Sequence, residues 1–141
     1  MKLEIAKIKK QNKKSPIKEF FDKIVAKMVK EAETELKDIM EQNGYKNVID
    51  LLNDIMLENK LTITLSDEEF AEFQKVSTRD YYRYTDSCTL HENGKYSTNR
   101  YNAQLLIEAL QDAGIKPPIR VTISMDKTAT LNLTITRYIE R

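Results

Sequence analysis

The chain has only one cysteine, three glycines and three prolines among its 141 residues, and it has no tryptophan. A single cysteine cannot close a disulfide within the chain, so no disulfide framework is expected. So few glycines and prolines argue against a fibrous or disordered chain. With one cysteine and one histidine, soft metal ligands are too few for a zinc centre. We therefore predict neither a bound metal nor a cofactor.

Long apolar runs and common catalytic motifs are missing as well. No stretch approaches the roughly 18 consecutive apolar residues of a membrane span. We find no glycine-rich phosphate loop, no H-E-x-x-H and no G-x-S-x-G. No signal peptide is visible, and together with the lone cysteine this favours a reducing, cytoplasmic location.

The composition is typical of a helix-rich globular protein. Hydrophobic residues make up 40% of the chain and charged residues 32%. A chain of this length buries roughly two-thirds of its unfolded surface, which needs no disulfide or metal. We expect one domain over residues 15–141, preceded by a basic arm over residues 1–14 that is poorly tied down.

The net charge of +1 conceals two opposed blocks. Residues 1–30 carry ten lysines and three carboxylates, whereas residues 31–76 carry twelve carboxylates and four lysines. Such asymmetry can indicate an anionic partner. It is equally consistent with a basic arm that pairs with the acidic part of its own chain or of a second copy.

A long first helix is the clearest local prediction. Ser15 suits the N-cap and Pro16 the first helical position, and Gly44 suits the C-terminal stop. Between them, apolar residues recur at helical spacing for roughly seven turns. This stripe either packs along the domain's own sheet and second helix or partly faces another copy.

The remaining pattern predicts an α+β fold in the order α-α-β-α-β-β-α-β-β. Three shorter helices and the long one would pack on one antiparallel sheet with a wet, threonine-rich second face. A capping box at Ser66 and Glu69 opens the third helix, and an Asn-Gly pair marks a hairpin. The second helix is expected at 46–58 and the fourth at 100–113, and the short third helix opens at Ser66 with Phe70 and Phe73 facing the core. The strands are expected at 61–65, 80–91, 95–98, 119–125 and 131–139.

Cys88 and His91 are the residues most open to a catalytic interpretation. A thiol beside an imidazole can form a nucleophile and base. However, residues three apart in a strand point to opposite faces. We therefore predict no catalytic residues and expect the protein not to be an enzyme.

The stretch from Arg79 to Tyr101 is the best candidate for a binding surface, because it holds five of the seven tyrosines. Tyr and Arg are enriched at protein interfaces and on platforms that stack unpaired bases. Tyr is also a good strand residue, so a structural role, a protein interface and a nucleotide or nucleic-acid face all remain open. The candidate residues here are Arg79, Tyr81, Tyr82, Arg83, Tyr84, Lys95, Tyr96, Arg100 and Tyr101.

The second candidate is the basic arm, where Lys9, Lys10, Lys13 and Lys14 could contact phosphates. A purely solubilising tail is the alternative. We predict a small non-catalytic interaction protein, of adaptor, accessory or inhibitor type, that binds another macromolecule and forms a homodimer. The alternative is a nucleic-acid- or nucleotide-binding protein that uses the arm lysines and the Tyr/Arg stretch.

Overall fold

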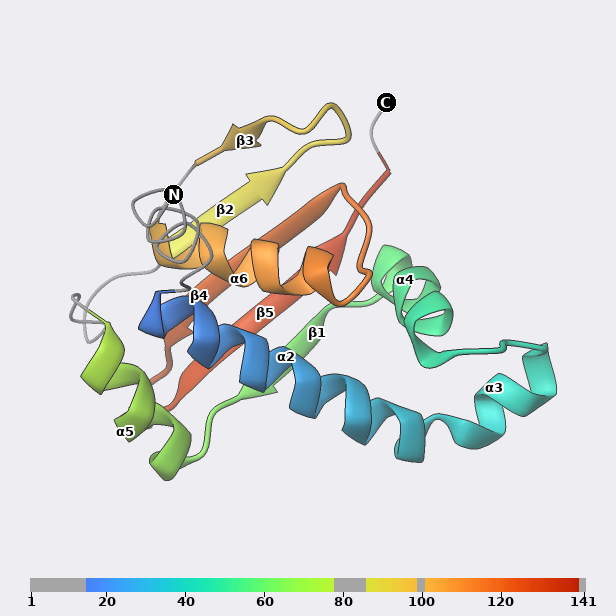
Figure 1. The fold of residues 1–141 in the computed structure, drawn as a ribbon, viewed down its shortest axis with the longest axis horizontal. Coiled ribbons are helices and arrows are strands. Elements are labelled where there is room, and N and C mark those ends of the chain that lie inside the picture. The colour runs from blue at the N-terminus through green and yellow to red at the C-terminus, as the bar shows by residue number, and fades with distance from the viewer. Residues whose placement is uncertain (1–14, 78–85, 99–100, 140–141) are drawn as a thin grey trace, which may run out of the picture.

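Five helices and five strands form the computed structural model, which describes residues 15–77, 86–98 and 101–139 (Figure 1). The predicted basic arm and the tyrosines at 81, 82 and 84 lie outside the described residues. The helices are α2 (Pro16–Glu35), α3 (Lys37–Asn43), α4 (Val48–Glu58), α5 (Asp67–Val76) and α6 (Tyr101–Asp112). The strands are β1 (Leu61–Thr64), β2 (Asp86–Leu90), β3 (Tyr96–Ser97), β4 (Ile119–Met125) and β5 (Leu131–Arg137).

The first helix begins as predicted but is interrupted near its end. The Ser15 hydroxyl accepts from the Lys18 amide at 3.2 Å, and Pro16 occupies the first helical position. Leu36 leaves helical geometry with φ −103° and ψ 11°, so the single helix predicted to run to Gly44 is divided into α2 and α3. α2 passes over the sheet, and α3, after the break, extends beyond the sheet at the right of Figure 1. Gly44, with φ 73°, then ends α3 as predicted.

The sheet is antiparallel throughout, with strand order β1-β5-β4-β2-β3. The predicted 61–65, 119–125 and 131–139 strands are therefore confirmed within a few residues. The predicted hairpin is also present, because His91 donates its amide to the Lys95 oxygen at 2.9 Å between β2 and β3. The described part of the predicted 80–91 strand begins at Asp86.

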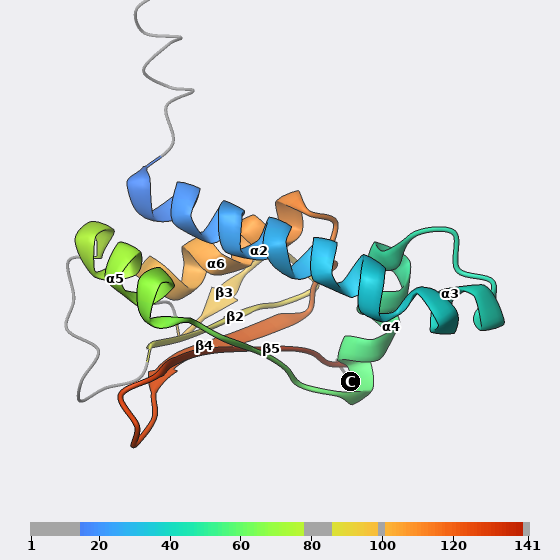
Figure 2. The same ribbon diagram turned by 90° about the horizontal axis from the view of Figure 1, so that it is seen from below.

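In Figure 2, α2, α5 and α6 lie on one face of the sheet, above the strands, whereas α4 lies beside the end of the sheet. Alternation places Ile119, Val121 and Ile123 of β4 on the helix side, each fully buried. Phe20 and Phe21 of α2 meet Phe73 of α5, with ring centroids 5.4–5.8 Å apart. The α+β architecture predicted from periodicity is thus confirmed.

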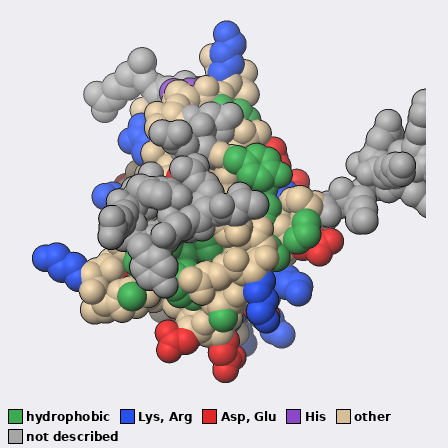
Figure 3. All heavy atoms as spheres, turned by 90° about the vertical axis from the view of Figure 1, so that its left-hand side faces the viewer, with side chains coloured by type: hydrophobic (Ala, Val, Ile, Leu, Met, Phe, Trp, Pro, Cys, Tyr) green, Lys and Arg blue, Asp and Glu red, His purple; other side chains and the backbone are tan. Residues whose placement is uncertain are grey.

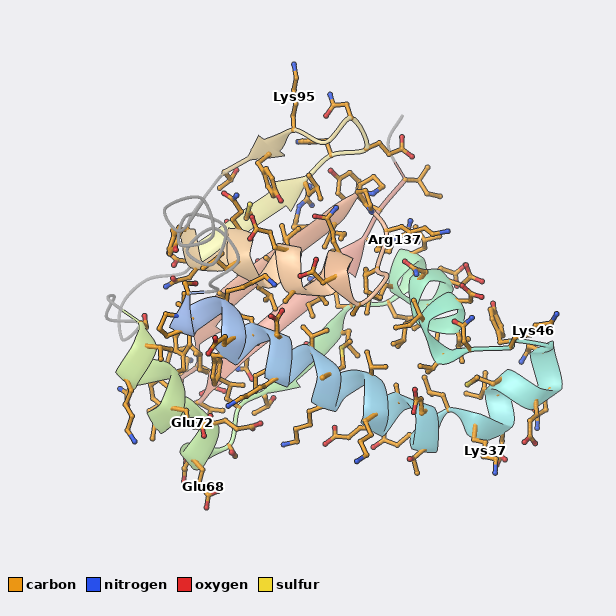
Figure 4. The ribbon with its side chains drawn as sticks, viewed as in Figure 1. Lys37, Lys46, Glu68, Glu72, Lys95 and Arg137 are labelled. Atoms are coloured by element: carbon orange, nitrogen blue, oxygen red, sulfur yellow. The ribbon has the colours of Figure 1, made fainter. Side chains whose placement is uncertain are left out.

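Arg137 and Asn53 join α4 to the loop between α6 and β4. The Asn53 side chain is buried, donates to the Gly114 oxygen at 3.0 Å and accepts from the Lys116 amide at 2.8 Å. Arg137 lies near α4 in Figure 4 and donates to the main-chain oxygens of Asn53, Lys116 and Pro117. These bonds fix the position of α4, which forms one side of the groove described next.

Candidate functional site

A groove of about 420 Å³ lies between the second half of α2 and the edge of the sheet at β1. Figure 2 looks toward this side: β1, in green, runs below α2 and connects toward α4 on one side and α5 on the other. α4 contributes Leu52 and Ile55 to its wall, and α5 contributes Glu69. A second hollow, of about 230 Å³, lies between the start of α2 and the end of α5.

Two neighbouring rows of α2 side chains line the groove. The apolar row consists of Ile24, Met28, Ala32 and Leu36, and the charged row consists of Lys27, Glu31 and Glu35. Members of each row are four residues apart, so each row follows one ridge of the helix. The first three members of the apolar row are buried, whereas the charged row is exposed. The groove therefore has an apolar floor and a charged rim.

The opposite wall of the groove is the outer edge of β1. The Leu65 amide donates to the Leu131 oxygen at 3.0 Å, and Ile63 pairs with Leu133 two residues away. In an antiparallel ladder, hydrogen-bonded pairs alternate with pairs whose amide and carbonyl groups point outward. Thr62 and Thr64 therefore turn their main-chain groups away from β5 and toward the groove side. Among the described strands, only β5 pairs with β1.

Lys27 and Glu69 form an ion pair with 3.1 Å between Nζ and Oε2, which links the charged row to α5. Hydrogen bonding to Glu69 raises the pKa of Lys27. Burial favours a higher pKa for Glu69, but hydrogen bonds from Ser66 and Lys27 outweigh it and lower the pKa of that carboxyl. Within the described chain, Glu31 and Glu35 form no ion pair or hydrogen bond. Glu31 still interacts electrostatically with Lys27, but the groove lining as a whole carries three carboxylates, Glu31, Glu35 and Glu69, and one lysine.

The face of the sheet opposite the helices is polar, as the alternating threonines predict. Thr62, Thr134, Thr122 and Ser87 stand opposite one another on four neighbouring strands. No described helix covers this face (Figure 2). It offers a row of hydroxyl groups rather than a charged surface.

Arg120 forms the charged end of this polar face. Its Nε donates to Thr89 Oγ1 at 3.2 Å, and its guanidinium carbon lies 5.0 Å from the centroid of the Tyr138 ring. The Tyr138 hydroxyl lies 3.1 Å from His91 Nδ1, and His91 Nε2 lies 2.9 Å from Ser97 Oγ. These contacts join the ends of β2, β3, β4 and β5.

Cys88 and His91 occupy different surroundings. Cys88 is fully buried on the helix side of β2, and His91 is half-buried beyond the end of that strand. In the described chain, the His91 ring nitrogens contact the hydroxyl groups of Ser97 and Tyr138. The arrangement provides no thiol–imidazole contact, although the prediction that the protein is not an enzyme stays a prediction.

Three of the predicted binding residues belong to the described chain. Lys95 is exposed and points away from the body in Figure 4, and Tyr101, at the start of α6, is 62% exposed. Tyr96 is half-buried against the core, and this burial raises the pKa of its hydroxyl, helped by Glu108 and Cys88. The predicted residues outside the described chain are Arg79, Tyr81, Tyr82, Arg83, Tyr84, Arg100, Lys9, Lys10, Lys13 and Lys14.

Acidic and basic side chains lie side by side on the face shown in Figure 3. On the face shown in Figure 3, acidic side chains gather at the lower end, over α5, with basic side chains beside them. Lys18 of the basic block pairs with Asp22 and Asp112, each at 2.7 Å, and Lys27 pairs with Glu69. The nucleic-acid interpretation stays a prediction, because most of the residues named for it lie outside the described chain.

Sequence reasoning missed the groove because its parts are ordinary elements. The rows at positions 24, 28 and 32 and at 27, 31 and 35 are visible in the sequence. Their position beside an outer strand depends on which strand pairs with which.

In the described residues, no cluster of three or more His, Cys, Asp or Glu side chains is arranged to hold a metal ion. In the same residues, no helix has the length and apolar character to cross a membrane.

Comparison of the chain with protein-family models, with curated proteins and with solved structures finds no match.

Proposed function

We propose that this chain is a small non-catalytic interaction protein that binds another protein through the groove between α2 and β1. The observation that carries the proposal is the combination of an apolar floor, a carboxylate rim and an outer strand whose Thr62 and Thr64 main-chain groups face outward. Apolar contact area supplies affinity, and directed polar groups at the margin supply orientation. An adaptor, accessory protein or inhibitor needs only such a surface.

Charge reversal on α2, with a control pair on α2 and α3, provides the test. Glu31→Lys/Glu35→Lys changes the groove rim, whereas Glu33→Lys/Glu41→Lys makes the same change at exposed positions that do not line the groove. Each tagged protein is used to capture partners from the cells that naturally contain it, and captured proteins are quantified by mass spectrometry. Both pairs are exposed, so the fold should tolerate either change.

We expect the wild type and the Glu33/Glu41 control to capture the same partner and the Glu31/Glu35 variant to lose it. Reciprocal capture with the purified partner must reproduce this order. Equal capture by all three proteins would show that the groove is not the binding site. Turnover of a small substrate that is lost on changing Cys88 or His91 would overturn the non-catalytic proposal itself.

A homodimer and a cytoplasmic location belong to the same proposal. The sequence motivates the dimer through the long apolar-striped helix and the opposed charge blocks. Sedimentation velocity over a wide range of protein concentration tests it. A monomer at every concentration would remove the homodimer from the proposal and leave the groove unaffected.

A further inference from the structure

We propose that the groove takes an extended segment of a partner protein, which joins the sheet as a new strand beside β1. This inference rests on the proposed function and names the form and chemistry of the partner segment. In strand addition, main-chain hydrogen bonds to a sheet edge supply affinity, and pockets for alternate side chains supply specificity. Both parts are present at this edge.

The first part is the main chain of β1. Thr62 and Thr64 each turn an amide donor and a carbonyl acceptor outward, because the intervening residue Ile63 and the following Leu65 are the ones bonded to β5. Residues 61–65 extend over about 17 Å, which matches an incoming strand of five or six residues. The sheet's other outer strand, β3, has only two residues and offers a much shorter template.

The second part is the apolar row of α2, which lies beside that edge. Ile24, Met28 and Leu36 line the same groove as Leu61 and Ile63. A strand beside β1 would point every second side chain toward this floor and the others toward the polar face. The incoming segment should therefore have apolar residues at alternate positions.

The rim selects the charge of the segment. The groove is lined by three carboxylates, Glu31, Glu35 and Glu69, and by one lysine, Lys27, so the charge of its lining is negative. A segment with Lys or Arg beside its apolar residues complements these carboxylates. A second copy pairing edge to edge through β1 would instead bring two such acidic rims together. Charge thus favours a basic partner segment over the edge of another copy.

The test separates main-chain pairing from side-chain contact at one position. Thr62→Pro removes the outward amide but leaves the β1–β5 ladder intact, since the Thr62 amide is not part of that ladder. Thr62→Val keeps the amide and removes only the hydroxyl. Thermal unfolding of the two variants establishes that both are folded before binding is measured.

The probe is a peptide selected from a random dodecapeptide phage library on the full-length protein and then synthesised. We expect its sequence to alternate apolar residues and to contain Lys or Arg. Thr62→Val should bind it like the wild type, whereas Thr62→Pro should bind it roughly five- to tenfold more weakly. In a strand added beside β1, every second peptide amide would donate to β1. N-methylation of those amides should weaken binding about as much as Thr62→Pro does, whereas N-methylation of the alternate amides should have little effect.

A charge exchange completes the experiment. Glu31→Lys/Glu35→Lys should prefer a version of the peptide with Glu in place of its basic residues, which a general loss of structure would not produce. Equal binding by Thr62→Pro and Thr62→Val, or insensitivity to N-methylation, would overturn strand addition. The proposed function would survive that result if Glu31→Lys/Glu35→Lys still lost the captured partner, and it would fail separately if capture were unchanged.

Two other occupants have distinct signatures. A synthetic peptide of residues 1–14 that binds more tightly than the selected peptide, and loses affinity with Thr62→Pro, would assign the groove to the chain's own N-terminal segment. Dimerisation that Thr62→Pro abolishes in sedimentation would assign it to a second copy. Either result would overturn the proposal of a separate partner segment.

Discussion

Arg137 Nη1 donates a hydrogen bond to the main-chain oxygen of Asn53 at 2.7 Å, across 84 positions of sequence. The same guanidinium donates to the Lys116 and Pro117 oxygens, so one side chain joins the end of β5, α4 and the loop before β4. Burial lowers the pKa of Arg137, with Asp54 and Glu92 opposing the shift. The contact holds the helix that closes the α4 side of the groove.

Replacing Arg137 by Ala should therefore destabilise the fold by about 1–3 kcal/mol, since three carbonyl groups lose their donor. Arg137→Lys should recover only part of this loss, because an ammonium group cannot match the planar fork. Urea unfolding measures both variants. Lys95→Ala, at an exposed turn position, is the control and should change the free energy of unfolding by less than about 0.5 kcal/mol. Equal values for Arg137→Ala and the control would contradict the assigned role.

Asp126 organises the turn between β4 and β5. Its carboxylate accepts from the Thr128 hydroxyl, the Thr130 amide and the Asn132 side chain, and these bonds lower its pKa to about 2. Because the folded-state pKa is lowered, the contribution to stability is present above the ordinary pKa and is lost as the pH falls from about 4 through about 2. Thermal unfolding at several pH values should show a smaller acid loss for Asp126→Asn than for the wild type. Parallel curves would refute this expectation.

Phe73 is the fully buried member of α5 and meets two phenylalanines of α2. Phe73→Ala should cost about 3–5 kcal/mol, because it leaves a cavity where three rings meet. Phe70→Ala on the same helix is a matched control, since Phe70 is only half-buried and should cost less. Chemical denaturation gives both values, and a reversal of their order would show that α5 is not anchored through Phe73.

The capping box of α5 also supports the groove rim. Ser66 Oγ accepts from the Glu69 amide at 3.1 Å, while Glu69 Oε1 accepts from the Ser66 amide at 2.9 Å and Oε2 pairs with Lys27. Ser66→Ala should lower stability by about 1 kcal/mol, and Ser66→Thr should retain most of it. Comparing the two by urea unfolding checks the assignment. A full loss with Thr would point to a packing effect rather than to the cap.

Because Cys88 is buried, the rate at which its thiol reacts with a reagent reports how often the fold opens. Its side chain has no exposed surface, so a thiol reagent should react only when the fold opens. Labelling should be slow in buffer and should accelerate with urea in parallel with unfolding. Rapid labelling of the native protein, with an apparent thiol pKa well below the ordinary range, would instead revive a catalytic interpretation.

Much of the fold could be predicted because its signals are local. Ser15 with Pro16 marked the start of α2, and Ser66 with Glu69 marked α5, within a few neighbouring residues. The alternation of Ile119, Val121 and Ile123 was enough to assign the buried face of β4. These features depend on capping and periodicity, which each segment carries in its own sequence.

The groove could not be predicted because it depends on distant pairings. β1 is an outer strand only because β5, about 70 residues later, pairs with one of its sides. No glycine or proline lies near Leu36, so the sequence contains no signal for the interruption of the helix there. The Tyr/Arg stretch was selected on its composition alone. Composition indicates which contacts these residues can form, but it does not determine where they lie in the fold.

The strand order also governs what a nascent chain can do on the ribosome. β1 pairs with β5 and β2 pairs with β4, and both of these partner strands come later in the chain. α2 and α4 can form early from local contacts, whereas β1 and β2 have no described neighbour other than β3 until the β4–β5 hairpin emerges. Until then the apolar sides of the helices and of these strands are exposed together. The sheet is therefore predicted to assemble only after the β4–β5 hairpin is available, and the chain is most exposed to aggregation before that point.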